Sequence, residues 1–189
     1  MASADNDELL RRCQQGDDSA MCELVHNLQD RVFRLAFRVL GDASRAEDAT
    51  ADALATVWLR CGSWCGESQA GTWIYQVAWR VILDHQRSLR RWGRFWELKE
   101  ELISGVIDNP IETIANQEEF LLRLRQVTEA VQDLSTKDRA LVHMYYYDQK
   151  SLAEISTVLG GSRDSLKMRL SRIRKKLRSR IGENDETGK

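Results

Sequence analysis

The sequence has no uncharged apolar run of the roughly 20 residues that a membrane-spanning helix needs. Its first ten residues, MASADNDELL, are acidic and lack the basic-then-apolar order of a secretory signal. Apolar residues make up 42% of the chain and charged residues 30%, which is typical of a globular protein. We therefore expect a cytoplasmic protein that does not insert into a membrane.

Histidine and cysteine are too few and too scattered to predict a metal site. The histidines are far apart, and the nearest cysteines, Cys61 and Cys65 in CGSWC, are not followed by a second Cys/His pair at zinc-ligand spacing. Ordinary thiols are the favoured interpretation, with zinc binding and redox chemistry as alternatives. We expect no metal and no cofactor.

Catalytic motifs are also missing. The chain has no phosphate-cradling glycine loop, no HExxH and no GxSxG. Neighbouring carboxylates such as Glu47 and Asp48 point in different directions on a helix. We do not expect an enzyme, and a nucleic-acid-modifying enzyme is the least supported alternative.

Strand-like alternation and internal repeats are absent, and apolar residues recur at helical spacing almost throughout, so we expect an all-α fold. The first long stripe, which ends at Gly41, consists of Leu24, Leu28, Val32, Leu35 and Val39. Helices are also expected over about 44–59, capped by Ser44, and about 72–91, capped by Thr72. The Gly- and Ser-rich segment 61–71 is expected to be a loop.

Proline occurs once, at Pro110, within the least regular part of the chain. We expect a flexible linker at 95–115, with a short helix near 97–103, between a domain at 7–94 and another at 116–181. Residues 182–189 are expected to be a disordered tail.

The second domain has the pattern of a helix-turn-helix. We expect a helix that begins with an Asn116/Glu119 capping box, a second that begins at STKD (135–138) and a third that begins at SLAE (151–154). The glycines at 160–161 then make a turn, and Ser162 caps a basic helix to about residue 177.

Negative charge is scarce in this last helix. Residues 162–181 carry nine Lys and Arg residues against one Asp. Cations in such density suit a phosphate backbone. A solvated face would normally include Glu as well, so nucleic acid is the favoured partner.

The helix expected at 72–91 carries a second basic face, formed by Arg80, Arg87 and Arg91. Trp73, Tyr75 and Trp79 lie on the same helix, and aromatic rings among cations suit single-stranded nucleic acid. For each ring taken alone, packing in a core or an interface is the better interpretation.

Residues 42–52 have the opposite charge, with Glu47, Asp48 and Asp52 among their acids. Such a face would repel DNA, so it is either a spacer or a docking surface for a basic protein. A bland alternative is that these carboxylates complement the dipole of the helix N-terminus.

In this order the parts resemble a known family. RVFRLAFRVLGDASRAEDATADALATVWLR followed by TWIYQVAWRVILDHQRSLRR resembles region 2 of bacterial extracytoplasmic-function (ECF) sigma factors. VQDLSTKDRALVHMYYYDQKSLAEISTVLGGSRDSLKMRLSRIRKKLRSRI resembles their region 4. The resemblance implies a protein that binds core RNA polymerase and directs transcription initiation at promoters with −10 and −35 elements.

The resemblance also implies roles for residues. The helix with Glu47, Asp48 and Asp52 would bind the clamp helices of the largest polymerase subunit. The loop 61–72 and the following helix would recognise and melt the −10 element, with contacts from Trp73, Tyr75, Trp79, Arg80, Arg87 and Arg91. Two departures are Ala51 with Asp52 where the family usually has Gln-Glu, and Arg80 where it usually has Asn.

In region 4, the resemblance implies that helix 162–177 enters the major groove of the −35 element, and that the domain holds the polymerase flap. The implied DNA contacts are Ser162, Arg163, Ser165, Lys167, Met168, Arg169, Ser171 and Arg172, with Arg163 and Arg169 on phosphates. An anti-sigma factor that occludes these surfaces is a further expected partner. The alternative is a DNA-binding regulator that acts without polymerase, but nothing resembles the dimerisation coiled coil that a two-half operator would call for.

Overall fold

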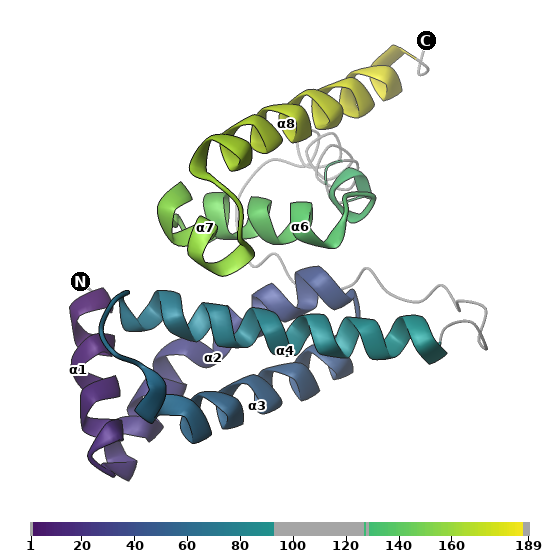
Figure 1. Cartoon of the computed structure of the whole chain (residues 1–189). Helices are drawn as coiled ribbons and strands as arrows, with labels where there is room; N and C mark the ends of the chain where they lie inside the picture. Colours follow the sequence, from purple (N-terminus) through teal and green to yellow (C-terminus); the bar gives the residue numbers. More distant parts are fainter. Residues whose placement is uncertain (1, 93–126, 128, 187–189) are drawn as a thin grey trace, which may run out of the picture.

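The computed structural model describes residues 2–92, 127 and 129–186, and throughout this part the regular elements are helical (Figure 1). The N-terminal unit consists of α1 (Ala2–Gln14), α2 (Asp18–Leu40), α3 (Ala43–Arg60), a short 3-10 turn (Cys61–Ser63) and α4 (Ala70–Trp92). The C-terminal unit consists of α6 (Thr136–Val142), a π-helical turn (His143–Tyr147), α7 (Leu152–Leu159) and α8 (Arg163–Glu186). This arrangement confirms the all-α fold with two helical domains. The expected helix at 97–103 and the capping box at Asn116 lie outside the described residues.

In the N-terminal unit, α2 packs against α1, α3 and α4. The predicted stripe on α2 is fully buried, and the small side chains of Ala46, Ala49 and Ala53 on α3 face the same core. Leu9 and Leu10 of α1 join Met21 and Leu24 of α2 in a second cluster, which also contains Trp64. Among the described residues, no helix is both long and apolar enough to cross a bilayer.

Two helix starts differ from the expected ones. The cap of α3 is Asp42 rather than Ser44: its carboxylate accepts a hydrogen bond from the Arg45 backbone N–H at 2.8 Å. Asp is as good a cap as Ser, and here it immediately follows Gly41, whose left-handed conformation (φ 75°) ends α2. Helix α4 begins at Ala70, so Thr72 is not its cap but a buried residue of its first turn.

The C-terminal unit begins its helices where the sequence indicates. Ser135 caps α6, and Ser151 forms a complete capping box with Glu154 at the start of α7. The turn to α8 uses positive φ at Gly160 (71°) and Gly161 (100°), which residues with a Cβ rarely adopt. The Ser162 hydroxyl then accepts from the Ser165 N–H.

Helix α8 runs on to Glu186, beyond the end expected near residue 177 and into the segment 182–189 expected as a tail. A lone glycine costs a helix about 1 kcal/mol, so Gly182 need not end it, and no proline follows. Residues 187–189 lie outside the described part.

The two units share one hydrophobic cluster. Tyr75, Trp79 and Ile82 of α4 are buried together with Leu141, Met144, Ile155 and Val158 of the C-terminal helices. Contacts join α4 to α7 and α2 to α6, and Figure 1 shows α6 and α7 on the α4 side of the N-terminal unit.

Candidate nucleic-acid and protein interfaces

The acidic residues of α3 form an exposed face. Glu47, Asp48 and Asp52 all lie in the solvent, on the opposite side of the helix from the buried alanines. Asp48 and Asp52 are one turn apart and therefore neighbours. Asp52 is 66% exposed, and its Oδ2 lies 2.8 Å from Nε2 of His85 on α4. Helix α3 thus presents carboxylates that a basic partner can reach without rearrangement of the core.

The aromatic residues of α4 lie mostly inside the structure. Tyr75 is 1% exposed and Trp79 is 6% exposed, while Trp73 is half-buried. Arg80 and Arg87 are exposed, and Arg87 pairs with Asp84 at 2.9 Å. The side chain of Arg91 lies outside the described part. Of the residues expected to contact the −10 element, Arg80 and Arg87 therefore face solvent, whereas Tyr75 and Trp79 are buried.

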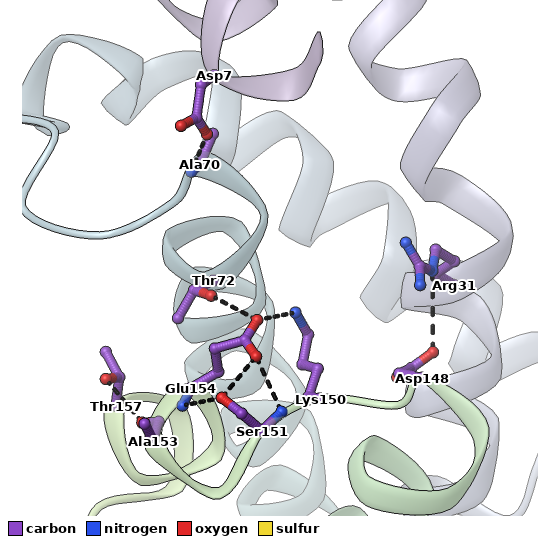
Figure 2. Close-up of polar contacts among 10 residues, drawn as sticks. All are labelled: Asp7, Arg31, Ala70, Thr72, Asp148, Lys150, Ser151, Ala153, Glu154 and Thr157. Atoms are coloured by element: carbon purple, nitrogen blue, oxygen red, sulfur yellow. Dashed lines mark hydrogen bonds and ion pairs between the residues drawn. The ribbon is translucent and has the colours of Figure 1, made fainter. Parts of the chain in front are cut away.

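Polar contacts link α4 to the start of α7 (Figure 2). Thr72 donates to Oε1 of Glu154 at 3.3 Å, and Nζ of Lys150 lies 3.4 Å from the same oxygen. The same Nζ lies 4.5 Å from the centre of the Tyr75 ring. One turn along α4, Gln76 donates to the carbonyl of Thr157 at 3.2 Å.

Burial, hydrogen bonds and neighbouring charges together set the ionisation of the groups at this junction. Burial first, and then the charge of Asp148, raises the pKa of the Tyr75 phenol, so the ring stays neutral. Burial disfavours the charged form of Glu154, but its hydrogen bonds with Ser151 and the charge of Lys150 outweigh that effect. The pKa of Glu154 is consequently lowered, and its carboxylate remains charged between the two units.

A buried acid also connects the units (Figure 2). Oδ1 of Asp148 lies 3.9 Å from Nε of Arg31 on α2, and its Oδ2 lies 3.5 Å from Nε2 of His143. Burial lowers the pKa of His143 despite the neighbouring Asp148. Beside this pair, the Arg38 guanidinium lies 5.3 Å from the centre of the Tyr147 ring.

Helix α8 turns most of its expected DNA residues to solvent. Its buried face consists of Leu166, Leu170 and Ile173. The exposed members of the expected set are Ser162, Arg163, Ser165, Lys167, Met168, Ser171 and Arg172. Arg169 differs because its Nε pairs with Asp138 and its Nη2 donates to Ser135, so it ties α8 to the cap of α6. Arg172 lies nearby in the wall of a hollow of about 520 Å³ between these helices.

Two family models match the chain. The model described as Sigma-70 region 2 matches residues 24–92, and the one described as Sigma-70, region 4 matches residues 124–177. Two curated relatives named ECF RNA polymerase sigma factor SigK are similar over nearly the whole chain. The one from Mycobacterium tuberculosis (strain ATCC 25618 / H37Rv) is 29% identical over 94% of this chain and 92% of its own. The one from Mycobacterium sp. (strain KMS) is 27% identical over 89% and 86%.

Solved structures show the same fold. The structure of CnrH in complex with the cytosolic domain of CnrY matches with a TM-score of 0.67 at 18% identity, and covers 95% of this chain and 98% of that one. The sigma factor RpoE of Bartonella quintana, crystallised with the anti-sigma factor NepR, matches with a TM-score of 0.68 at 16% identity, over 85% and 95%.

The helix-turn-helix with its cationic second helix, joined to a helical unit with an acidic face, defines a two-domain transcription factor. With both matched regions in the expected order, the chain belongs to the sigma-70 family and is a sigma factor of the ECF type.

Proposed function

We propose that this sigma factor binds polymerase and promoter DNA through separate surfaces of opposite charge. The observation that carries the proposal is that Asp48 and Asp52 are exposed on α3, whereas Lys167 and Arg172 are exposed on α8. The acidic face binds core RNA polymerase, and the cationic helix binds the −35 element. The protein acts in the cytoplasm and performs no catalysis of its own.

The polymerase contact uses Glu47, Asp48 and Asp52 against the clamp helices of the largest subunit. A carboxylate face cannot bind DNA phosphates, but it attracts a basic protein surface and speeds its docking. Residues 116–181 act as region 4 and also hold the flap. Residues 95–115 act as the linker between this region and region 2, at residues 7–94.

The −35 contact places the N-terminal half of α8 in the major groove. Lys167, Met168, Ser171 and Arg172 face the bases, while Ser162, Arg163 and Ser165 hold phosphates near the helix N-terminus. Arg169 contacts phosphate only if it leaves Asp138, so we assign it the weakest DNA role of the set.

The −10 contact uses the loop that precedes α4 and the exposed face of α4, with Arg80, Arg87 and Arg91 near phosphates. Trp73, Tyr75 and Trp79 stack on unpaired bases. Because Tyr75 and Trp79 are covered by the C-terminal helices, their use requires α7 to separate from α4. Core polymerase can supply that separation, because its clamp and flap bind the two units at different places.

An anti-sigma factor controls this activity. One structural neighbour, the sigma factor RpoE, was crystallised with the anti-sigma factor NepR, and another, CnrH, was solved in complex with the cytosolic domain of CnrY. An inhibitor that binds both units while α7 covers α4 would keep the −10 residues buried.

Charge reversal on α3 tests the polymerase contact. Asp48→Arg with Asp52→Arg should abolish co-purification with core polymerase and leave the fold intact, because both side chains are exposed. The matched control is Glu23→Arg with Asp30→Arg, the same change of charge at two exposed positions of α2. Unchanged co-purification of the α3 variant would assign the polymerase contact elsewhere, and absence of any wild-type complex would favour a regulator that acts without polymerase.

A further inference from the structure

Helix α1 holds the loop that connects α3 to α4. Three of its side chains do so: Asp7, Arg11 and Gln14, whose spacing of four and three residues places them on one face. Oδ1 of Asp7 accepts from the backbone N–H of Ala70 at 2.6 Å. Nε2 of Gln14 donates to the carbonyl of Cys61 at 2.9 Å and to that of Trp64 at 2.7 Å. Helix α1 thus binds both ends of residues 61–69, called the recognition loop below.

Asp7 of α1 supplies an acceptor for the first N–H of α4. The N–H of Ala70, the first residue of α4, has no acceptor within the helix and donates to Oδ1 of Asp7, whereas the N–H groups of Thr72 and Trp73 donate to the carbonyl of Gln69. A carboxylate at this position also interacts favourably with the helix dipole. The start of α4 is therefore set by a residue more than 60 positions earlier in the chain.

Trp64 anchors the middle of the recognition loop. It is 6% exposed, its Nε1 donates to the carbonyl of Ser68 at 2.9 Å, and the Arg11 guanidinium lies 5.7 Å from its ring centre. Between these anchors the chain turns at Gly66, where φ is 81°. The residues left exposed at the surface are Gly62, Ser63, Cys65, Gly66, Glu67 and Gln69.

Gln14 has a role that apolar packing cannot replace. The carbonyl of Cys61 accepts from the Trp64 N–H, which closes the 3-10 turn, and the side-chain amide of Gln14 donates to that carbonyl and to the carbonyl of Trp64 as well. Gln14 is itself exposed, so it contributes little to the core. By bonding two carbonyls that are three residues apart in the loop, Gln14 fixes the path of the loop relative to α1.

We propose that α1 positions the recognition loop for the −10 strand, and that Gln14 is its main positioning residue. This inference rests on the proposed function, in which the loop contacts unpaired bases. Helix α1 lies outside the segment matched by the region 2 model, which begins at residue 24. Gln14 does not touch DNA; it holds the exposed loop residues in the conformation that binds a base.

The test measures strand binding by the complete chain assembled with core polymerase. The probe is a fluorescent single-stranded oligonucleotide with the −10 non-template sequence of a promoter mapped by run-off transcription, alongside versions with one base changed. Gln14→Ala should weaken binding of the matched strand about two- to tenfold, the range of one or two ordinary hydrogen bonds. It should also reduce discrimination between matched and changed bases.

Two further variants separate hydrogen bonding from other effects. Gln14→Glu keeps the length of the side chain but replaces the donor with a carboxylate facing two carbonyls, so it should impair binding at least as much as Gln14→Ala. Gln15→Ala alters the same residue type one position on, where the side chain is exposed and makes none of these bonds, and should leave binding unchanged. Polymerase binding and −35 duplex binding should stay at wild-type values in all three, and thermal stability should fall by no more than the hydrogen bonds removed account for.

Each outcome has a distinct meaning. If wild-type protein with polymerase does not bind the strand, the proposed −10 function fails. If wild-type protein binds and Gln14→Ala binds equally well with equal discrimination, the positioning role is wrong although the proposed function stands. If Gln14→Ala lowers thermal stability and weakens polymerase and −35 binding in parallel, Gln14 is a structural residue and the inference is overturned.

Discussion

Replacing Lys150 with Gln should loosen the contact between the two units. The Lys150 side chain is 12% exposed, and its ammonium lies 4.5 Å from the centre of the Tyr75 ring across the junction. Its other partner, Glu154, belongs to the same unit as Lys150. The ion pair with Glu154 lies within one unit, so the contact of Lys150 that itself crosses the junction is the one with Tyr75.

The magnitude follows from the contact that crosses the junction. A cation over an aromatic ring contributes about 0.5–1 kcal/mol when exposed and about 2 kcal/mol when desolvated. With Lys150 mostly buried, we expect a loss of about 1–2 kcal/mol. That loss corresponds to a roughly 5- to 30-fold increase in the ratio of separated to touching units.

Single-molecule energy transfer can measure this ratio. Dyes placed at Ser88→Cys on α4 and Lys175→Cys on α8, both exposed positions, would report separation in a background without native cysteines. For Lys150→Gln, the ratio of the low-transfer to the high-transfer population should rise roughly 5- to 30-fold over wild type. Lys150→Arg, which keeps the cation, should resemble wild type. Identical distributions for Lys150→Gln and wild type would refute the reasoning.

Two further predictions concern the C-terminal unit. Arg172→Ala should weaken binding of the −35 duplex by about 1–3 kcal/mol if the guanidinium contacts a base edge, and titration against duplexes with single changed pairs should localise the loss to one position; equal loss on all sequences would assign Arg172 to phosphate. Because burial lowers the pKa of His143, the unfolded chain binds more protons than the folded chain just below the ordinary pKa of about 6.5. Stability should therefore be full above pH 6.5 and fall as the pH drops towards the folded pKa. Urea unfolding at several pH values should show a flatter dependence for His143→Gln than for wild type, and parallel curves would show that another group is responsible.

Much of the fold could be predicted from local patterns. The buried stripe of α2 and the caps at Ser135, Ser151 and Ser162 depend on neighbours a few residues away, which the sequence displays directly. Helix α1 was not predicted, because its apolar pair Leu9 and Leu10 is too short to form a helical stripe by itself. It is stabilised instead by packing on α2 and α4.

The candidate site was predicted less completely, because burial between two units is a long-range property. Exposed charges such as Asp48 and Arg172 follow from the polar face of an amphipathic helix, and the structure places both in solvent. Tyr75 and Trp79 look like available rings in the sequence but are buried in the cluster that α4 shares with the C-terminal helices. Gln14 gave no signal, because its partners are carbonyls about 50 residues away.

Reconstituted transcription measures promoter-directed initiation by this protein itself. Core RNA polymerase, purified without its own sigma factors, is mixed with this protein and fragmented bacterial DNA, and the 5′ ends of the transcripts are mapped. We expect discrete start sites, each preceded by a shared pair of elements near −10 and −35, that disappear when the Asp48→Arg, Asp52→Arg variant replaces the wild type. Transcripts no different from those of core polymerase alone, together with the absence of a stable complex, would contradict this expectation.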